Sequence, residues 1–381
     1  MKRVLLIIAA VMLCCCLSMS GRKRDVKFSN AGTAYIERSF STYDVLQKQI
    51  HSFAELGYME YRSSGLLASH LESNGFRVEM GVAGIPTAFV ATFGSGSPEY
   101  DALPGMSQDT VAYKKALKDG APGHGCGHNL LGTGSVACPV AISKWLAEGH
   151  QGTVVLFGCP AEEGGGGKAY MAREGCFDGV DAILDWHPDI CNLVNVESGL
   201  ANVQMRFTFH GVSSHASSAP EKGRSALDAV EAFNFMMNMM REHVPDGTRI
   251  HYVITDGGKA PNVVPDRAEV LYYLRNRSRA VVQDLKERAI KAAEGAAMGT
   301  GTTVEFEAVS GNFERLYNES LAQVLQRNLE TVGGVEYDAR EMAFAEEMLE
   351  ASGINDKSVL KKPSMVLPLG ADYPTLKGVS S

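Results

Sequence analysis

Two histidines and a cysteine occupy His124, Cys126 and His128, and glycine is the only residue type between them. Glycine lets a backbone bend so that neighbouring side chains reach one point. Cysteine thiolate and histidine imidazole are both ligands for divalent metals. The stretch therefore suggests a metal site. A flexible polar loop is the simpler alternative, and the rest of the chain has to decide between the two.

Further polar residues follow two patterns that are typical of buried strands. Glu162 and Glu163 come soon after "TVVLFG", and His187 comes directly after "AILDW". Open α/β sheets bind ligands beyond the carboxyl ends of their strands. Cys126 and His128 precede a helical pattern of the same sheet. We therefore expect a Cys-His-Glu-His ligand set to converge at that edge, with room for water.

The adjacent carboxylates Glu162 and Glu163 suit two different tasks in such a site. One binds the metal, and the other accepts a proton from water that the metal has made more acidic. A solvated acidic turn is the alternative, but the pair lies between a buried strand and a glycine run. The pattern therefore favours metal-assisted hydrolysis.

Two other chemistries fit the spacing poorly. A phosphate-binding loop needs glycine where this chain has Glu162, and Ser or Thr where it has Ala169 after Lys168. A cysteine nucleophile at Cys126 would need an oriented base, and nothing in the sequence orients His128, one residue beyond Gly127.

The composition sets the class of protein. The chain has 381 residues and is 45% hydrophobic, enough for two domains with apolar cores. The net charge is −8 and the body of the chain has no long basic run, which argues against a nucleic-acid partner. A small-molecule amide or dipeptide-like substrate is the better expectation.

Strand and helix patterns alternate in the first half. A helical pattern over 40–75 ends at Asn74-Gly75, and strand patterns follow at 76–80 and 87–93. A helix is then predicted over 129–149, a strand over 153–158, a helix over 167–175 and a strand over 182–186. This alternation predicts a doubly wound α/β sheet.

The pattern changes from Gly199. Strand, helix, strand, strand, helix and strand patterns follow in that order, which is the ferredoxin-like arrangement. We predict an inserted domain at 199–315, with 31–198 and 316–381 forming the first domain. The Met236, Met237, Met239 and Met240 cluster is expected to pack a core or a dimer face.

The first twenty residues resemble a secretory signal peptide. Lys2 and Arg3 precede a fourteen-residue apolar run that is short for a membrane span, and small residues follow it. We therefore expect a periplasmic or secreted protein. The basic "GRKR" that follows leaves a cytoplasmic location as the alternative, and Cys14–Cys16 leave a lipid anchor open.

Five motifs in order carry a family resemblance over nearly the whole chain after residue 35: "GHGCGHNLLGT", "GCPAEEGGGGK", "WHPD", "SSHASSAPEKGRSALDAV" and "GGKAPNVVPDRAEVLYYLR". They resemble the amidohydrolase branch of the dinuclear-metal carboxypeptidase family. The resemblance implies a zinc-exopeptidase-like catalytic domain, an inserted lid that also dimerises, and two Zn²⁺ or Mn²⁺ ions. It also leaves open a partner chain of a different sequence.

The same resemblance implies roles for individual residues. Those of the first domain are ligands at Cys126, His128, Glu163 and His187, a general base at Glu162, and a ligand-orienting carboxylate at Asp101. Those of the inserted domain are an oxyanion donor at His215 and substrate-carboxylate contacts at Asn262 and Arg275. The implied reaction is hydrolysis of the amide bond of N-acyl or N-aroyl amino acids.

The chain departs from this family in three places. "GSGSP" stands where the family has a buried strand before Asp101, which is expected to displace that carboxylate. Pro139 falls inside the predicted helix and is expected to kink it. The family supplies one more histidine ligand late in the chain, whereas no histidine follows His251 here, so the second metal site is expected to be incomplete. The alternative to an enzyme is thus a truncated, non-catalytic metal- or peptide-binding remnant.

Overall fold

A computed structural model describes residues 30–93, 99–163, 165–196 and 198–371. The chain forms two compact units. The first is built from two stretches, one that ends at Val196 and one that resumes at Asn318, and the second is Glu197–Tyr317. The predicted inserted domain, 199–315, lies within the second unit. The predicted signal peptide, residues 1–20, lies outside the described residues.

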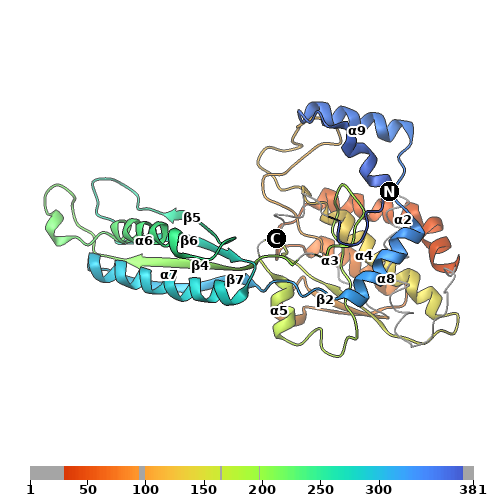
Figure 1. The fold of residues 1–381 in the computed structure, drawn as a ribbon, viewed down its shortest axis with the longest axis horizontal. Coiled ribbons are helices and arrows are strands. Elements are labelled where there is room, and N and C mark those ends of the chain that lie inside the picture. Colours follow the sequence, from red (N-terminus) through yellow and green to blue (C-terminus); the bar gives the residue numbers. More distant parts are fainter. Residues whose placement is uncertain (1–29, 94–98, 164, 197, 372–381) are drawn as a thin grey trace. The chain divides into compact units, whose positions relative to one another are not determined.

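Three helices form the larger core of the first unit. They are α2 (Asn30–Phe53), α3 (Tyr61–Ser73) and α4 (His128–Leu146), and α2 and α3 both pack against α4 (Figure 1). The predicted stop of the first helical region is confirmed, since Asn74 caps α3 and Gly75 has a φ of 88°. Helix α4 is buried on nearly all sides, which makes it the central support of this unit.

The first unit has a described sheet of three strands. Strands β1 (Arg77–Met80), β2 (Phe89–Phe93) and β3 (Val154–Gly158) pair in that order, and both pairings are antiparallel. The predicted strands at 76–80, 87–93 and 153–158 are therefore found, but the alternation with helices does not make these strands parallel.

The strand predicted over 182–186 is wrong. Ile183, which a buried strand would cover, is 45% exposed. Trp186 instead anchors this segment, because its indole Nε1 donates to Ser135 Oγ on α4 at 3.1 Å and its ring packs beside Trp145. Side-chain docking on the helix thus replaces backbone pairing here.

Shorter elements complete the first unit. They are η1 (Val82–Gly84), α5 (Gly167–Arg173), α8 (Glu319–Val332), α9 (Ala339–Ala351) and η4 (Lys357–Ser364). Asn318 caps α8 by accepting from the Leu321 N–H, and α8 buries Leu329 against Val335. The predicted return of the chain to the first domain as a helix is thus found.

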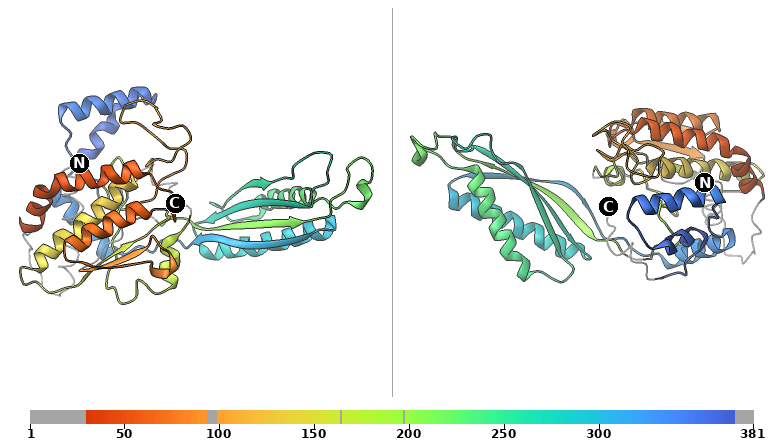
Figure 2. Two further views of the ribbon diagram at one scale, coloured as in Figure 1. Left: turned by 180° about the vertical axis from the view of Figure 1, so that it is seen from behind. Right: turned by 90° about the horizontal axis from the view of Figure 1, so that it is seen from above.

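The second unit confirms the ferredoxin-like order. Its elements are β4 (Ala201–His210), η2 (Pro220–Lys222), α6 (Ala226–Met240), η3 (Arg241–His243), β5 (Arg249–Asp256), β6 (Arg267–Asn276), α7 (Arg279–Thr300) and β7 (Thr303–Asn312). The strands pair antiparallel in the order β5-β6-β4-β7. Helices α6 and α7 cover one face of this sheet (Figure 2).

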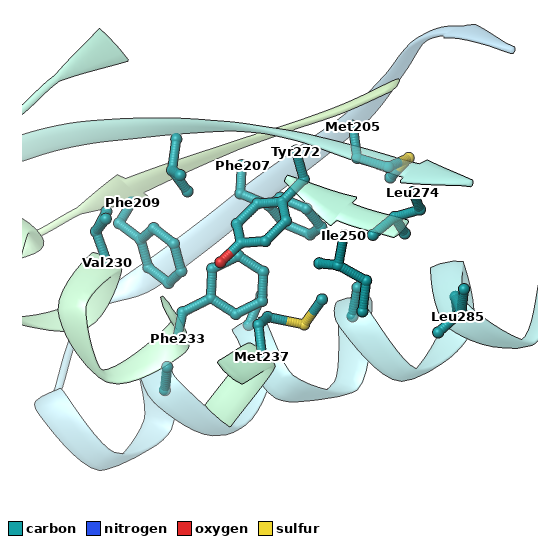
Figure 3. Packing of buried hydrophobic residues seen from close by; sticks show 14 of the residues in the cluster. Met205, Phe207, Phe209, Val230, Phe233, Met237, Ile250, Tyr272, Leu274 and Leu285 are labelled. Carbon is teal, nitrogen blue, oxygen red and sulfur yellow. The ribbon is translucent and has the colours of Figure 1, made fainter. Parts of the chain in front are cut away.

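Aromatic side chains fill the core of the second unit (Figure 3). Phe207 and Tyr272 on the strands point toward Phe233 on α6, with ring centroids 4.7 Å and 5.0 Å from its ring. Each buried aromatic side chain contributes about 1.5–3 kcal/mol through apolar burial. Of the methionine cluster on α6, Met237 is buried in this core while Met239 is 59% exposed. Among the described residues, no helix has the length and apolar character that crossing a bilayer requires.

Candidate metal centre

The Gly127–His128 junction starts α4 and fixes the first ligand. Gly127 caps the helix with a φ of 78°, a conformation that favours glycine, and a Cβ there would approach Pro188 Cγ at 3.2 Å. His128 is the first residue of α4 and is fully buried. Glycine spacing therefore lets the loop turn into the helix close to the segment that carries His187.

The predicted thiol and imidazole groups meet. Cys126 Sγ lies 3.3 Å from His187 Nε2, and the rings of His128 and His187 are 5.7 Å apart, edge to face. One ligand atom from each of the three residues lies within 4.8 Å of the others. His187 Nδ1 donates to the Pro188 carbonyl at 2.8 Å, which leaves Nε2 as the atom that faces the thiol.

The two adjacent carboxylates reach the same imidazole. Glu162 Oε2 lies 3.7 Å and Glu163 Oε1 lies 3.9 Å from His128 Nε2. Both side chains are about one-fifth exposed, so they line the centre without being closed off from water. The sequence-based expectation of one Cys-His-Glu-His cluster is thus met by the geometry.

A strained backbone presents these carboxylates. Ala161, just before them, has a φ of 56°, which L-residues other than glycine adopt only at a cost. Its N–H donates to Glu60 Oε1 at 2.8 Å, and Thr87 Oγ1 donates to the other oxygen of Glu60 at 2.9 Å. Glu60 is fully buried, so it is a fixed anchor for the turn that leads into Glu162.

Asp101 orients both a histidine and a carboxylate. His128 Nδ1 donates to Asp101 Oδ1 at 3.0 Å, and the Glu163 N–H donates to Asp101 Oδ2 at 2.8 Å. The expectation that Asp101 would be displaced is therefore wrong. Its segment is held by other means, because Leu103 and Gly123 exchange two backbone hydrogen bonds of 3.0 Å. The "GSGSP" stretch itself lies outside the described residues.

Pro139 does not disturb the ligand end of α4. The helix continues through Pro139 to Leu146, and the residues around it are buried. A proline removes only the hydrogen bond to the carbonyl four residues earlier, that of Ser135 here. That carbonyl lies about two turns beyond His128, so the expected damage to ligand geometry is absent.

The centre attracts positive charge. Burial lowers the pKa of His128, but hydrogen bonds to Asp101 and Cys126 and the nearby carboxylates outweigh it and raise the pKa to about 10. Hydrogen bonds from His128 and His187 lower the pKa of the Cys126 thiol. Burial raises the pKa of Glu162 above its ordinary value. A proton on His128 thus occupies a position that suits a cation.

The residues fit a divalent metal ion. His128 Nε2 and Glu163 Oε1 are buried and make no hydrogen bond in the described part of the chain, which is costly unless a ligand completes them. Ligand atoms bound at about 2.0–2.3 Å to one ion lie about 3–4 Å apart, close to the separations seen here. Thiolate and imidazole favour Zn²⁺, whereas the carboxylates also suit Mn²⁺.

His215 and Asn262 lie together at one end of the second unit. The Ala216 N–H donates to the Asn262 carbonyl at 3.0 Å. His215 Nδ1 accepts from the N–H groups of Ser217 and Ser218, both at 3.3 Å, so the ring proton belongs on Nε2 and points outward as a donor. The geometry is compatible with an oxyanion donor.

Arg275 lies at the opposite end of the same sheet. Arg267, beside His210, begins β6 and Arg275 is near its end, a separation of about 27 Å along one strand. The guanidinium of Arg275 lies 4.0 Å above the Tyr273 ring, and its buried Nε has no partner among the described residues. The structure therefore does not bring Asn262 and Arg275 together within one unit.

Three residues of this centre were not anticipated from the sequence: Glu60, Glu99 and Lys168. Glu99 is buried, and its Oε2 lies 3.7 Å from His128 Nε2. Lys168 forms ion pairs with Glu99 and Asp185. No local pattern marks these residues, although Glu99 stands only two positions before Asp101.

Fold and site together define a two-unit protein with a hydrolytic metal centre in one unit and a ferredoxin-like second unit. The chain matches the peptidase dimerisation domain of the M20 family over residues 198–300. It is 43% identical to one of the two p-aminobenzoyl-glutamate hydrolase chains of Escherichia coli (strain K12), over 84% of this chain and 69% of that protein. It is 28% identical to the Xaa-Arg dipeptidase of Mus musculus, over 87% and 76% of the two chains.

Solved structures share the fold. An aminobenzoyl-glutamate utilization protein from Klebsiella pneumoniae matches with a TM-score of 0.59 at 20% identity, covering 84% of this chain and 97% of that one. A dinuclear metal binding M20 peptidase from Bacillus subtilis matches with a TM-score of 0.53 at 20% identity, over 74% and 77% of the two chains. The chain belongs to the M20 family of metal-dependent amidohydrolases and peptidases. Such enzymes hydrolyse the amide bonds of acyl amino acids, and the predicted fold class and enzyme class are thereby confirmed.

Proposed function

We propose that this chain hydrolyses the amide bond between an aroyl or acyl group and an amino acid, with p-aminobenzoyl-glutamate as the first candidate substrate. One observation carries the proposal. The buried imidazole of His128 presents an Nε2 without a hydrogen-bond partner in the described part of the chain to carboxylate oxygens at 3.7–3.9 Å, beside the Cys126–His187 contact of 3.3 Å. The name of the relative at 43% identity supports the substrate.

Cys126, His128, Glu163 and His187 would hold the divalent ions, Zn²⁺ or Mn²⁺. A bound ion would polarise the substrate carbonyl and make a water acidic enough to attack it at neutral pH. Asp101 would keep the His128 ring and the Glu163 backbone in place through the hydrogen bonds of 3.0 and 2.8 Å.

Glu162 is proposed as the general base. Its carboxylate lies near the cluster, 3.7 Å from His128 Nε2, where it can take a proton from the attacking water and pass it to the leaving amine. Burial raises its pKa above the ordinary value, which strengthens it as a base. Its activity requires the ionised form, so turnover should fall as the pH drops through that raised pKa.

The second unit would supply substrate contacts. Arg275 has the fork geometry for a substrate carboxylate, and His215 presents an N–H for a developing oxyanion. Because these groups lie at opposite ends of one sheet, a single unit cannot place both on one small substrate. We therefore propose a homodimer in which two chains complete each site. A hetero-partner is a second arrangement, since the other p-aminobenzoyl-glutamate hydrolase chain of Escherichia coli is also a relative, at 25% identity.

The test is release of p-aminobenzoate from p-aminobenzoyl-glutamate by the purified chain with Zn²⁺ or Mn²⁺, with and without chelator. Glu162→Gln should abolish release but keep the metal bound, whereas Glu148→Gln, an exposed glutamate of the same unit, should change neither. Release that survives Glu162→Gln would refute the role of Glu162. Metal binding without turnover of acyl amino acids would favour a non-catalytic remnant.

We also propose export of the protein, on the basis of the basic and then apolar leader at residues 1–20. Cell fractionation with and without these residues tests this: a protein that stays cytoplasmic with the leader intact would contradict export.

A further inference from the structure

The "GGGGK" stretch, which no phosphate-loop interpretation explains, ends in a lysine that contacts two separate parts of the metal centre. Lys168 lies at the start of α5 and is 35% exposed. Its ammonium pairs with Glu99 Oε1 and lies 3.3 Å from Asp185 Oδ2. Glu99 is two residues before Asp101, and Asp185 is two residues before His187.

Lys168 thus connects three segments that arrive from different parts of the chain. One carries Asp101, one carries His187, and the third is its own segment, which begins at Glu162 and Glu163. In the described part of the chain these segments share no strand ladder, since the predicted strand over 182–186 is not formed. Ion pairs therefore link Lys168 to the two flanking segments.

Glu99 passes the effect of Lys168 directly to a ligand. Its side chain is 6% exposed, so an unpaired carboxylate there would be costly, and Lys168 offsets its charge. The other oxygen of Glu99 lies 3.7 Å from His128 Nε2. Close packing supports this arrangement, because a Cβ on Gly132 of α4 would lie only 2.8 Å from the Glu99 carbonyl oxygen.

We propose that Lys168 is a positioning residue of the metal centre, which holds the segments bearing Asp101 and His187 against the Glu162–Glu163 segment through its ion pairs with Glu99 and Asp185. The inference rests on the proposed function in that it takes Cys126, His128, Glu163 and His187 as metal ligands. It adds a residue that touches neither metal nor substrate but determines how well the ligands are arranged.

The test measures Zn²⁺ affinity by competition with a chromogenic chelator, together with kcat and KM at saturating Zn²⁺. Lys168→Met should weaken Zn²⁺ binding by about 10- to 100-fold, the range typical for loss of a group that orients metal ligands. It should also lower kcat with little change in KM. Lys168→Arg should recover most of the affinity, because a guanidinium can pair with two carboxylates.

The matched control is Lys115→Met. Lys115 forms an exposed ion pair of 2.8 Å with Asp109 in the same unit but contacts no ligand-bearing segment, so its loss should leave Zn²⁺ affinity unchanged. Glu99→Gln and Asp185→Asn each break one link of Lys168. Combined with Lys168→Met, each should cost less than the sum of the single effects, because the changes share one interaction.

Equal Zn²⁺ affinity in the Lys168→Met and Lys115→Met proteins would overturn the inference. A raised KM with unchanged Zn²⁺ affinity would also overturn it, since Lys168 would then bind substrate. If Lys168→Met does not fold, unchanged Zn²⁺ affinity in both Glu99→Gln and Asp185→Asn would overturn it instead. Wild-type protein that binds Zn²⁺ but hydrolyses no acyl amino acid would refute the proposed function and leave the role of Lys168 standing.

Discussion

Replacing Glu60 should separate the stability of the first unit from the geometry of Glu162. The buried carboxylate accepts from the Ala161 N–H at 2.8 Å and from Thr87 Oγ1 at 2.9 Å. Hydrogen bonds to a charged acceptor contribute about 1.5–3 kcal/mol each. Glu60→Ala leaves both donors without a partner, so we expect it to lower the free energy of unfolding by about 3–5 kcal/mol. It should also reduce kcat, because the strained turn at Ala161 then loses its anchor.

Glu60→Gln is the matched variant, because it keeps an acceptor for Ala161 but has no charge. Burial raises the pKa of Glu60 above its ordinary value, although the hydrogen bonds from Ala161 and Thr87 oppose this. The unfolded chain therefore ionises this carboxyl more readily than the folded protein does. Wild-type protein should lose stability from this group as the pH rises from the ordinary value through the raised pKa, whereas Glu60→Gln should not.

Urea unfolding followed by tryptophan fluorescence measures this difference. The chain has two tryptophans, Trp145 and Trp186, and both lie in the first unit, so the signal reports on the unit that contains Glu60. The stability of Glu60→Gln relative to wild type should increase between pH 4 and pH 7. A difference that does not vary with pH, or a loss below about 1 kcal/mol for Glu60→Ala, would refute the role of Glu60 as a buried anchor.

Three further predictions follow from the same contacts. Asp101→Asn offers only one acceptor oxygen to the His128 Nδ1–H and the Glu163 N–H, so Zn²⁺ affinity should fall by about 10- to 100-fold; unchanged affinity by chelator competition would show that Asp101 orients no ligand. Zn²⁺ binding at pH 7 should release protons, because the pKa of His128 is about 10 without metal; calorimetry in two buffers of different ionisation enthalpy measures this, and equal heats would contradict it. Phe233→Ala should destabilise the second unit by about 3–5 kcal/mol, since its ring is fully buried against Phe207 and Tyr272; proteolysis should then cut first within this unit, and early cuts elsewhere would count against this core.

The histidine-glycine-cysteine stretch shows how far local sequence determines a site. Ligand type and glycine spacing were sufficient to predict that Cys126, His128 and the Glu162–Glu163 pair converge with His187. Each of these residues stands at the end of an element with a clear hydrophobic period. The order of elements in the second unit was equally predictable, because its strands alternate and its helices carry one apolar face.

Strand pairing and the supports of the site were decided only by tertiary structure. Periodicity marks a strand but says nothing about its partner or direction, so the antiparallel order β1-β2-β3 was not predicted. The segment at 182–186 resembles a strand locally, but Trp186 docks on α4 instead. Glu60, Glu99 and Lys168 contact groups far away in the chain, and the free energy of such contacts depends on burial that exists only after folding. The sequence by itself therefore determined which residues can bind metal, and the tertiary structure determined what holds them in place.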